Sequence, residues 1–169
     1  MKKSPSSAAT RKAALVAVVG SLNLDYIAKV RRLPAPGETI PALEFLQRWG
    51  GKGANQAVAA ARQGTDVRLI GCVGNDPGGT AYLEHLKAEG MTRDGISIIP
   101  KQPTGTALIA VDKHGENQII VAGGANSTVT PRTLRTHRAL IASAGVLLLQ
   151  LEVPVAAVLE AMRIAQRAG

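Results

Sequence analysis

The 169-residue sequence is poor in cysteine and in aromatic side chains, and each shortage excludes a class of protein. Its one cysteine, Cys72, cannot form an intrachain disulfide and lies in the apolar run VRLIGCVG. We therefore expect Cys72 to be a small buried core residue in a reducing compartment, which excludes a disulfide-rich secreted domain. Aromatic residues make up only 2% of the chain, so it offers little for the base-stacking platforms of single-strand nucleic-acid binders.

Long hydrophobic runs are also missing. The longest apolar stretches, AALVAVV and GVLLLQLEV, are much shorter than the roughly 20 residues that a bilayer-spanning helix requires. We therefore expect a cytoplasmic protein with no membrane partner.

The net charge of +8 is unevenly distributed along the chain. The first 14 residues, MKKSPSSAATRKAA, contain four basic and no acidic residues, which is half of that excess. We expect residues 1–14 to form a disordered basic tail, although a transit peptide or the start of a secretory signal has a similar composition. The remaining charge is too small to indicate a nucleic-acid partner.

The apolar pattern of residues 15–169 predicts one α/β domain. Apolar runs at residues 15–19, 67–73 and 146–151 do not alternate with polar residues, which is typical of parallel strands covered on both faces. Helical patterns follow these runs at residues 54–63, 80–89 and 155–168, and another precedes the third run at residues 131–142. We expect a doubly wound, mostly parallel sheet with helices on both faces. Because the pattern stops after the third core strand and its helix, the domain looks truncated.

Segments at about residues 26–48 and 96–124 do not fit that sheet. TALIAVD and NQIIVAG flank a turn that contains Gly115, which predicts a β-hairpin over residues 106–121. We expect these segments to form a small projecting β-sheet, a lid that covers a site.

A glycine-rich run, GGKGANQ at residues 50–56, directly precedes a predicted helix. Such a run lets backbone N–H groups approach a polar or anionic ligand closely. It is not a P-loop, because Gly53 stands where the P-loop has serine or threonine, and it is not a dinucleotide fingerprint, because Gln56 replaces the third glycine. The alternative interpretation is a tight turn.

Polar residues follow the first and third predicted core strands. Asn23 and Asp25 come soon after the first strand, and Gln150 and Glu152 stand at the end of the third. Ligands in open α/β sheets bind beyond the carboxyl ends of strands, so these side chains could converge on one polyol. An Asx-turn is the alternative for Asn23 and Asp25.

Six segments, taken in order, are similar to one known family: GSLNLD, GGKGANQAVAAAR, GCVGNDPGG, PTGTALIAV, GGAN and LLQLE. Together they resemble the N-terminal half of the phosphofructokinase-B, or ribokinase-like, family of sugar kinases, over nearly all of residues 15–169. The resemblance implies a doubly wound α/β body with a small β lid, and transfer of a phosphoryl group from ATP to the 5-hydroxyl of D-ribose or a related pentose. It also implies Mg²⁺ and a monovalent cation as cofactors, and a homodimer formed through the lid. The substrate-binding residues that it implies are Asn23, Asp25, Gly51, Lys52, Gly53, Ala54, Asn55 and Glu152.

The motif that carries the family's catalytic residue does not occur in this sequence. The family's base is an aspartate in a G-A-G-D motif, which is absent here, so the catalytic aspartate is expected beyond Gly169 together with the ATP and magnesium sites. A chain without these groups should do no chemistry by itself. Two hypotheses stay open: the sugar-binding half of a kinase, or a non-catalytic sugar-binding or dimerising module derived from one. Nucleic-acid binding, a third, rests on charge alone.

Overall fold

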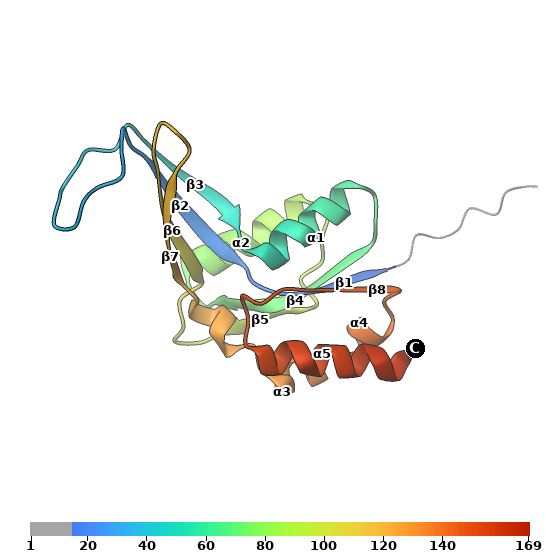
Figure 1. Cartoon of the computed structure of the whole chain (residues 1–169). Helices are drawn as coiled ribbons and strands as arrows, with labels where there is room; N and C mark the ends of the chain where they lie inside the picture. Colours follow the sequence, from blue (N-terminus) through green and yellow to red (C-terminus); the bar gives the residue numbers. More distant parts are fainter. Residues whose placement is uncertain (1–14) are drawn as a thin grey trace, which may run out of the picture.

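The computed structural model describes residues 15–169, so the predicted basic tail lies outside the described residues. A central sheet has four parallel strands in the order β5-β4-β1-β8 (Figure 1). The strands are β1 (Val16–Val19), β4 (Val67–Gly74), β5 (Ile96–Ile99) and β8 (Val146–Leu149).

Helices cover both faces of this sheet. One face carries α1 (Lys52–Arg62) and α2 (Pro77–Ala88), and the other carries α3 (Pro131–Thr136), α4 (Arg138–Ala142) and α5 (Val155–Ala168) (Figure 1). Two hydrophobic clusters result, one on each face of the sheet. Cys72 is fully buried in the cluster between the sheet and helices α3, α4 and α5. Burial on both faces explains why the strand sequences are continuously apolar. The predicted doubly wound α/β fold is confirmed.

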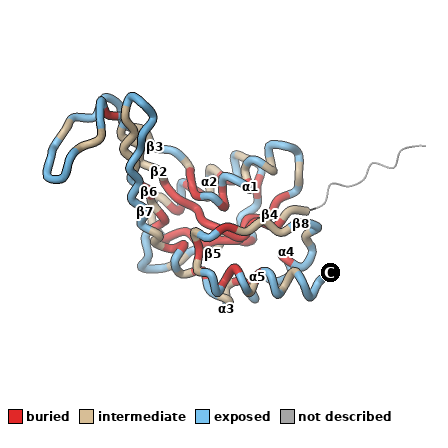
Figure 2. Tube along the Cα trace, viewed as in Figure 1, coloured by how far each residue is buried: buried red, intermediate tan, exposed pale blue. Residues whose placement is uncertain are grey.

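A second sheet projects from the body in the order β3-β2-β6-β7 (Figure 1). Its strands are β2 (Asn23–Lys29), β3 (Glu44–Gly50), β6 (Gly105–Val111) and β7 (Asn117–Ala122). The β6–β7 pair is the predicted hairpin, and the short helix η1 (Gly124–Thr128) returns the chain to the body. The outer part of this sheet is far more exposed than the central one (Figure 2).

Two expectations about these elements are wrong, and one alternative is excluded. Residues 96–99 do not belong to the projecting sheet, because β5 pairs in parallel with β4, from Gly71 with Ile96 onward. The described core therefore has four strands instead of three. The helix expected at residues 131–142 is interrupted at His137, which separates α3 from α4. Asn23 and Asp25 do not form an Asx-turn, since both belong to strand β2.

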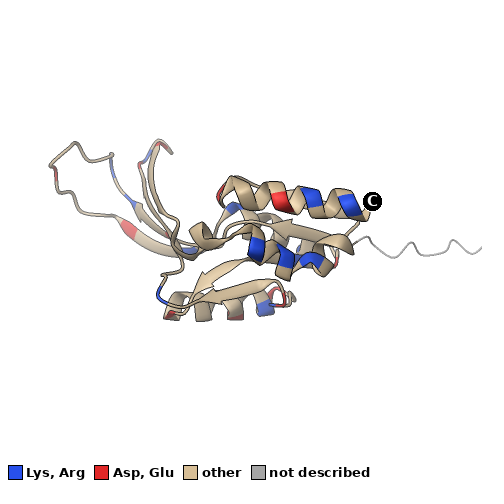
Figure 3. Ribbon diagram, turned by 90° about the horizontal axis from the view of Figure 1, so that it is seen from below, with Lys and Arg blue, Asp and Glu red and all other residues tan. Residues whose placement is uncertain are grey.

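Charged side chains are spread over the helices and the projecting sheet (Figure 3). On the α3–α5 side, Arg135 and Arg163 both approach the Glu160 carboxylate, at 3.2 and 3.7 Å. Among residues 15–169, every helix is too short or too polar to cross a bilayer.

Candidate functional site

A cavity of about 210 Å³ lies where the central sheet, helix α1 and the projecting sheet meet. Its lining has a polar part and an apolar part. The polar part consists of Asn23, Asp25, Gly51, Lys52, Asn55 and Glu152. The apolar part comes from the β6–β7 hairpin and consists of Ala107, Ile109, Ile119 and Val121.

The cavity lies at the carboxyl ends of two neighbouring strands, β1 and β8. From β1 the chain crosses one face of the sheet through α1 to β4, whereas it reaches β8 through helices on the other face. A crevice opens where the winding reverses, which is the usual place for ligands in open α/β sheets. Ser21 follows β1 and Glu152 follows β8, and the Ser21 hydroxyl donates to Glu152 Oε2 over 2.6 Å.

The Glu152 carboxylate is held in its ionised form at the N-terminus of α1. Besides the Ser21 hydroxyl, the backbone N–H of Lys52 donates to Glu152 Oε2 over 3.0 Å, and the Lys52 ammonium group pairs with Oε1. The positive end of the helix dipole favours a negative charge at this point. Burial is the largest single influence and raises the pKa of Glu152, but the bonds from Lys52 and Ser21 outweigh it and leave the pKa below its usual value.

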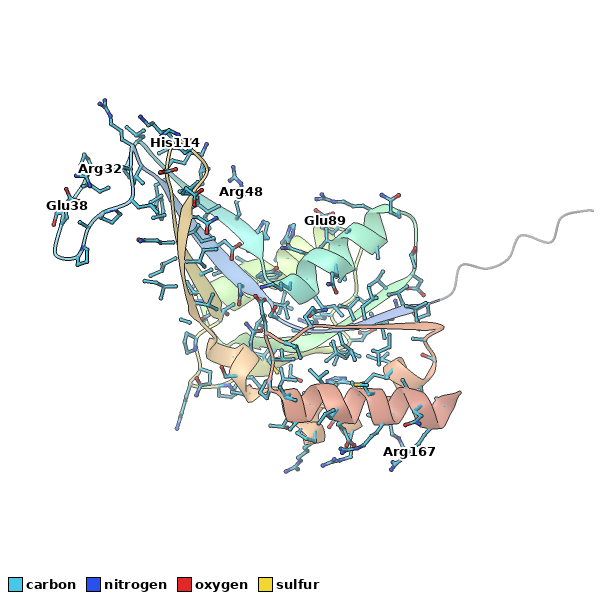
Figure 4. All side chains as sticks on the ribbon, in the orientation of Figure 1. Arg32, Glu38, Arg48, Glu89, His114 and Arg167 are labelled. Atoms are coloured by element: carbon cyan, nitrogen blue, oxygen red, sulfur yellow. The ribbon has the colours of Figure 1, made fainter. Side chains whose placement is uncertain are left out.

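The Asp25 carboxylate has no such partner. No hydrogen bond to it is found among residues 15–169, although the side chain is partly buried. Arg48 lies opposite Asp25 in the β2–β3 register, but it donates to the Gln47 carbonyl over 3.0 Å and extends outward from β3 (Figure 4). Burial, followed by the charge of Glu152, raises the pKa of Asp25. Its oxygens are therefore free to accept hydrogen bonds from a hydroxyl-bearing ligand.

Asn126, which the sequence analysis did not single out, fixes the orientation of Asn23. Asn126 is 1% exposed, and its Nδ2 donates to Asn23 Oδ1 over 2.7 Å and to the Leu22 carbonyl over 3.0 Å. In return, the Leu22 N–H donates to Asn126 Oδ1 over 2.9 Å. Because the carbonyl oxygen of Asn23 is occupied, its NH₂ group is the part left to donate to a ligand. The only local signal for Asn126 was its place in the GGAN segment.

Gly53 and Ala54 were predicted as site residues, but they do not line this cavity. Both are buried, and a Cβ on Gly53 would lie 2.6 Å from the Gly20 carbonyl carbon. Gly51 has a φ of +91°, and a Cβ there would lie 2.7 Å from the Ser21 carbonyl oxygen. These close contacts bring the start of α1 against residues 20–23, so Gly53 and Ala54 support the site from behind.

The apolar part of the lining, Ala107, Ile109, Ile119 and Val121, is called the apolar wall below, and it was not predicted residue by residue. Asp25 pairs with Ala107 and Ala107 with Val121, so these three side chains share one face of the sheet. Ile109 and Ile119 form the next pair on the same face. The alternation within the hairpin indicated that one face could cover a ligand, but not which one. The polar part of the lining, called the polar floor below, lies opposite the apolar wall. This arrangement suits a ring that has hydroxyl groups and an exposed C–H surface.

Two features of the described residues bear on metal and anion binding. Among residues 15–169, no three His, Cys, Asp or Glu side chains lie close enough together to hold a metal ion. The N-terminus of α1, which could receive a phosphate, already binds the Glu152 carboxylate.

Comparison with known proteins shows that this chain is similar to carbohydrate kinases. Residues 13–169 match the family described as pfkB family carbohydrate kinase. The ribokinase of Haemophilus influenzae is 41% identical over 152 residues, which is 90% of this chain and 50% of that protein. The ribokinase of Mus musculus is 41% identical over 158 residues, which is 94% of this chain and 49% of that protein.

A solved structure agrees with these sequence matches. The structure of Arabidopsis thaliana ribokinase complexed with ribose and ATP superposes with a TM-score of 0.83 at 34% identity, covering 93% of this chain and 51% of that one. The chain thus spans about half the length of the curated ribokinases that it matches.

Proposed function

The chain belongs to the pfkB family of carbohydrate kinases, and we propose that it is the sugar-binding half of an ATP-dependent kinase that phosphorylates the 5-hydroxyl of D-ribose or a related pentose. The observation that carries this proposal is the cavity in which Asp25, Asn23 and Glu152 oppose the apolar wall of the hairpin. The match to a ribokinase whose structure contains ribose supports the choice of sugar.

In this proposal each side of the cavity binds one side of the sugar. The Asp25 carboxylate accepts hydrogen bonds from two hydroxyl groups, and the NH₂ group of Asn23 donates to a third oxygen. Asn55 at the start of α1 and the remaining acceptor positions of Glu152 bind further hydroxyl groups. Ala107 and Val121 pack on the C–H face of the ring and exclude water from it.

In this proposal the nucleotide and its metal ion bind residues other than the described ones. ATP provides the phosphoryl group, and Mg²⁺, with a monovalent cation, is the expected accompanying ion. The described residues contain no cluster of three potential metal ligands, and the N-terminus of α1 is occupied by Glu152. We assign the ATP site, the ion sites and the catalytic base to the portion of the relatives that the chain does not span. Phosphoryl transfer depends on positioning and charge neutralisation, so this chain alone should bind sugar without phosphorylating it.

Dimerisation through the projecting sheet and a cytoplasmic location complete the proposal. Leu108 and Ile120 are paired on the face of this sheet away from the cavity and are 52% and 69% exposed, and exposed apolar groups of this size commonly mark an interface. Cys72, buried and unpaired, suits a reducing compartment.

Isothermal titration of the purified chain with D-ribose tests the sugar site, and a coupled assay with ATP and Mg²⁺ tests for transfer. We expect saturable binding of D-ribose and no ribose phosphate. L-Glucose serves as the control sugar, because it carries hydroxyl groups in the wrong arrangement. Absence of D-ribose binding, or equal binding of the control, would refute the sugar site. Reading the gene beyond Gly169 for a G-A-G-D motif distinguishes a kinase half from a non-catalytic sugar-binding module.

A further inference from the structure

A partly buried hydrogen-bond cluster joins the body of the domain to the base of the hairpin. The Asp76 carboxylate receives three bonds of 2.7 Å: Oδ1 accepts from the Gly79 N–H and the Thr104 hydroxyl, and Oδ2 accepts from the Thr104 N–H. The Thr104 oxygen in turn accepts from the Gly74 N–H over 3.0 Å. We call these three bonded groups, Asp76, Thr104 and the Gly74 N–H, the Asp76 clamp.

The clamp lies where the rigid and projecting parts of the molecule meet. Gly74 ends strand β4 and Asp76 is the N-cap of α2, so both belong to the body. Thr104, 3% exposed, immediately precedes β6 in the projecting sheet. The other end of the hairpin returns to the same place, because the Ala125 N–H donates to the Pro103 carbonyl over 2.8 Å. Entry and exit of the hairpin are therefore fixed together at residues 103–104.

Position at this base determines position at the cavity. Ala107, in strand β6, lies three residues after Thr104, and Val121 is paired with Ala107. A strand is stiff over so short a distance, so a shift or rotation at Thr104 moves the apolar wall relative to the polar floor. Asp76 itself does not line the cavity.

We propose that Asp76 is a positioning residue for sugar binding. Through Thr104 it holds the β6–β7 hairpin in the position, relative to the polar side chains of the cavity, in which the apolar wall contacts the sugar. This role rests on the proposed function only in its effect on the sugar, since the positioning of the hairpin is a property of the protein alone. Bonds to an ionised carboxylate are shorter and stronger than neutral ones, which suits a joint that must hold a small projecting sheet. Burial raises the pKa of Asp76, but the bonds from Thr104 and Gly79 outweigh it and lower the pKa overall, which keeps the clamp ionised.

Asp76→Asn tests the bonds of Asp76 to Thr104 without removing its role as the N-cap of α2. The variant keeps an acceptor for the Gly79 N–H, and asparagine caps helices about as well as aspartate. Its NH₂ group, however, faces the Thr104 N–H in place of Oδ2. Thr104→Val removes the hydroxyl at similar volume, whereas Thr104→Ser retains it. Asp94→Asn is the matched charge control, because Asp94 is exposed and makes no hydrogen bond through its side chain among the described residues.

Amide hydrogen exchange of the sugar-free chain is the first measurement, and titration with D-ribose is the second. In Asp76→Asn and Thr104→Val we expect residues 105–122 to exchange about ten-fold faster while β1 and β4 keep their protection, and D-ribose to bind about ten-fold more weakly. Thr104→Ser and Asp94→Asn should match the wild type in both measurements.

Each other outcome distinguishes the clamp from the sugar site. Unchanged exchange in the hairpin, or equal acceleration in hairpin and core, refutes the positioning role, because the second pattern reports only a general loss of stability. Faster exchange in the hairpin with an unchanged D-ribose affinity refutes the link to the sugar. If the wild type binds no D-ribose, the proposed function fails, while the exchange data still decide whether Asp76 positions the hairpin.

Discussion

We expect Asp25→Asn to weaken the binding of D-ribose without lowering the stability of the fold. The substitution keeps the size of the side chain, which matters because a Cβ on the neighbouring Gly50 would lie 2.1 Å from Asp25 Oδ2. It removes the negative charge and one acceptor oxygen. In the proposed complex a sugar hydroxyl then loses its charged partner, at a cost of about 1.5–3 kcal/mol, so the Kd for D-ribose should rise about 10- to 150-fold.

The same substitution should not destabilise the fold. The Asp25 carboxylate accepts no hydrogen bond among the described residues, and burial followed by the charge of Glu152 raises its pKa. A raised carboxyl pKa means that the ionised form is less favourable in the folded state than in the unfolded chain. This penalty is present above the folded pKa and disappears as the pH falls below the ordinary value of 3.8. At neutral pH the free energy of unfolding of Asp25→Asn should therefore equal or exceed that of the wild type.

Titration calorimetry with D-ribose and urea unfolding at pH 7, both on the purified chain, measure the two effects. Asp66→Asn is the matched control, because Asp66 forms a surface ion pair with Arg68 and does not line the cavity. A wild-type Kd in Asp25→Asn would show that the sugar does not contact this carboxylate. Lower stability together with weaker binding would show that Asp25 supports the fold, contrary to the reasoning above.

Two further substitutions test the helix that forms one side of the cavity. Gly53→Ala places a methyl group 2.6 Å from the Gly20 backbone, so we expect a loss of about 1–3 kcal/mol and a melting temperature several degrees lower, measured by thermal unfolding; an unchanged melting temperature would contradict the close packing. Glu152 has a lowered pKa, so its bonds stabilise the fold above the ordinary pKa of 4.5, and this contribution is lost as the pH falls through the lower folded value. Glu152→Gln should therefore flatten the acid side of the stability profile in urea unfolding between about pH 3 and pH 6, and an unaltered profile would contradict the assignment.

The sequence was sufficient for the elements whose signal is local. The three apolar runs became β1, β4 and β8, and the helix predicted at residues 155–168 has the observed bounds of α5. Strand β5 was misassigned because ISII is only four residues long and its membership depends on pairing with β4, a long-range contact without a local signature. The break at His137 was missed for a similar reason, since neither proline nor glycine marks it.

The residues of the candidate site also differ in whether a local sequence signal predicts them. Its polar side chains were predictable because they stand next to strand ends or at a helix start, where chain direction alone determines which edge of the sheet they reach. Ala107, Val121 and the Asp76 clamp depend on register and on contacts between residues far apart in sequence. Pattern reasoning places such residues on a face or in a loop, but it does not choose their partners.

The glycine-rich run shows how a correct local principle can lead to a different use in the folded chain. Its predicted property, a helix N-terminus whose N–H groups approach an anion, is present, and the anion is the protein's own Glu152 carboxylate. Glu152 is thereby ionised and fixed in direction, while Asp25 across the cavity stays unpaired, and the two carboxylates repel each other. In the proposed complex a neutral polyol relieves that repulsion by donating hydroxyl groups to both carboxylates, whereas a phosphate group would add about two more negative charges. On the proposed function, the two carboxylates therefore favour an uncharged sugar over a phosphorylated one.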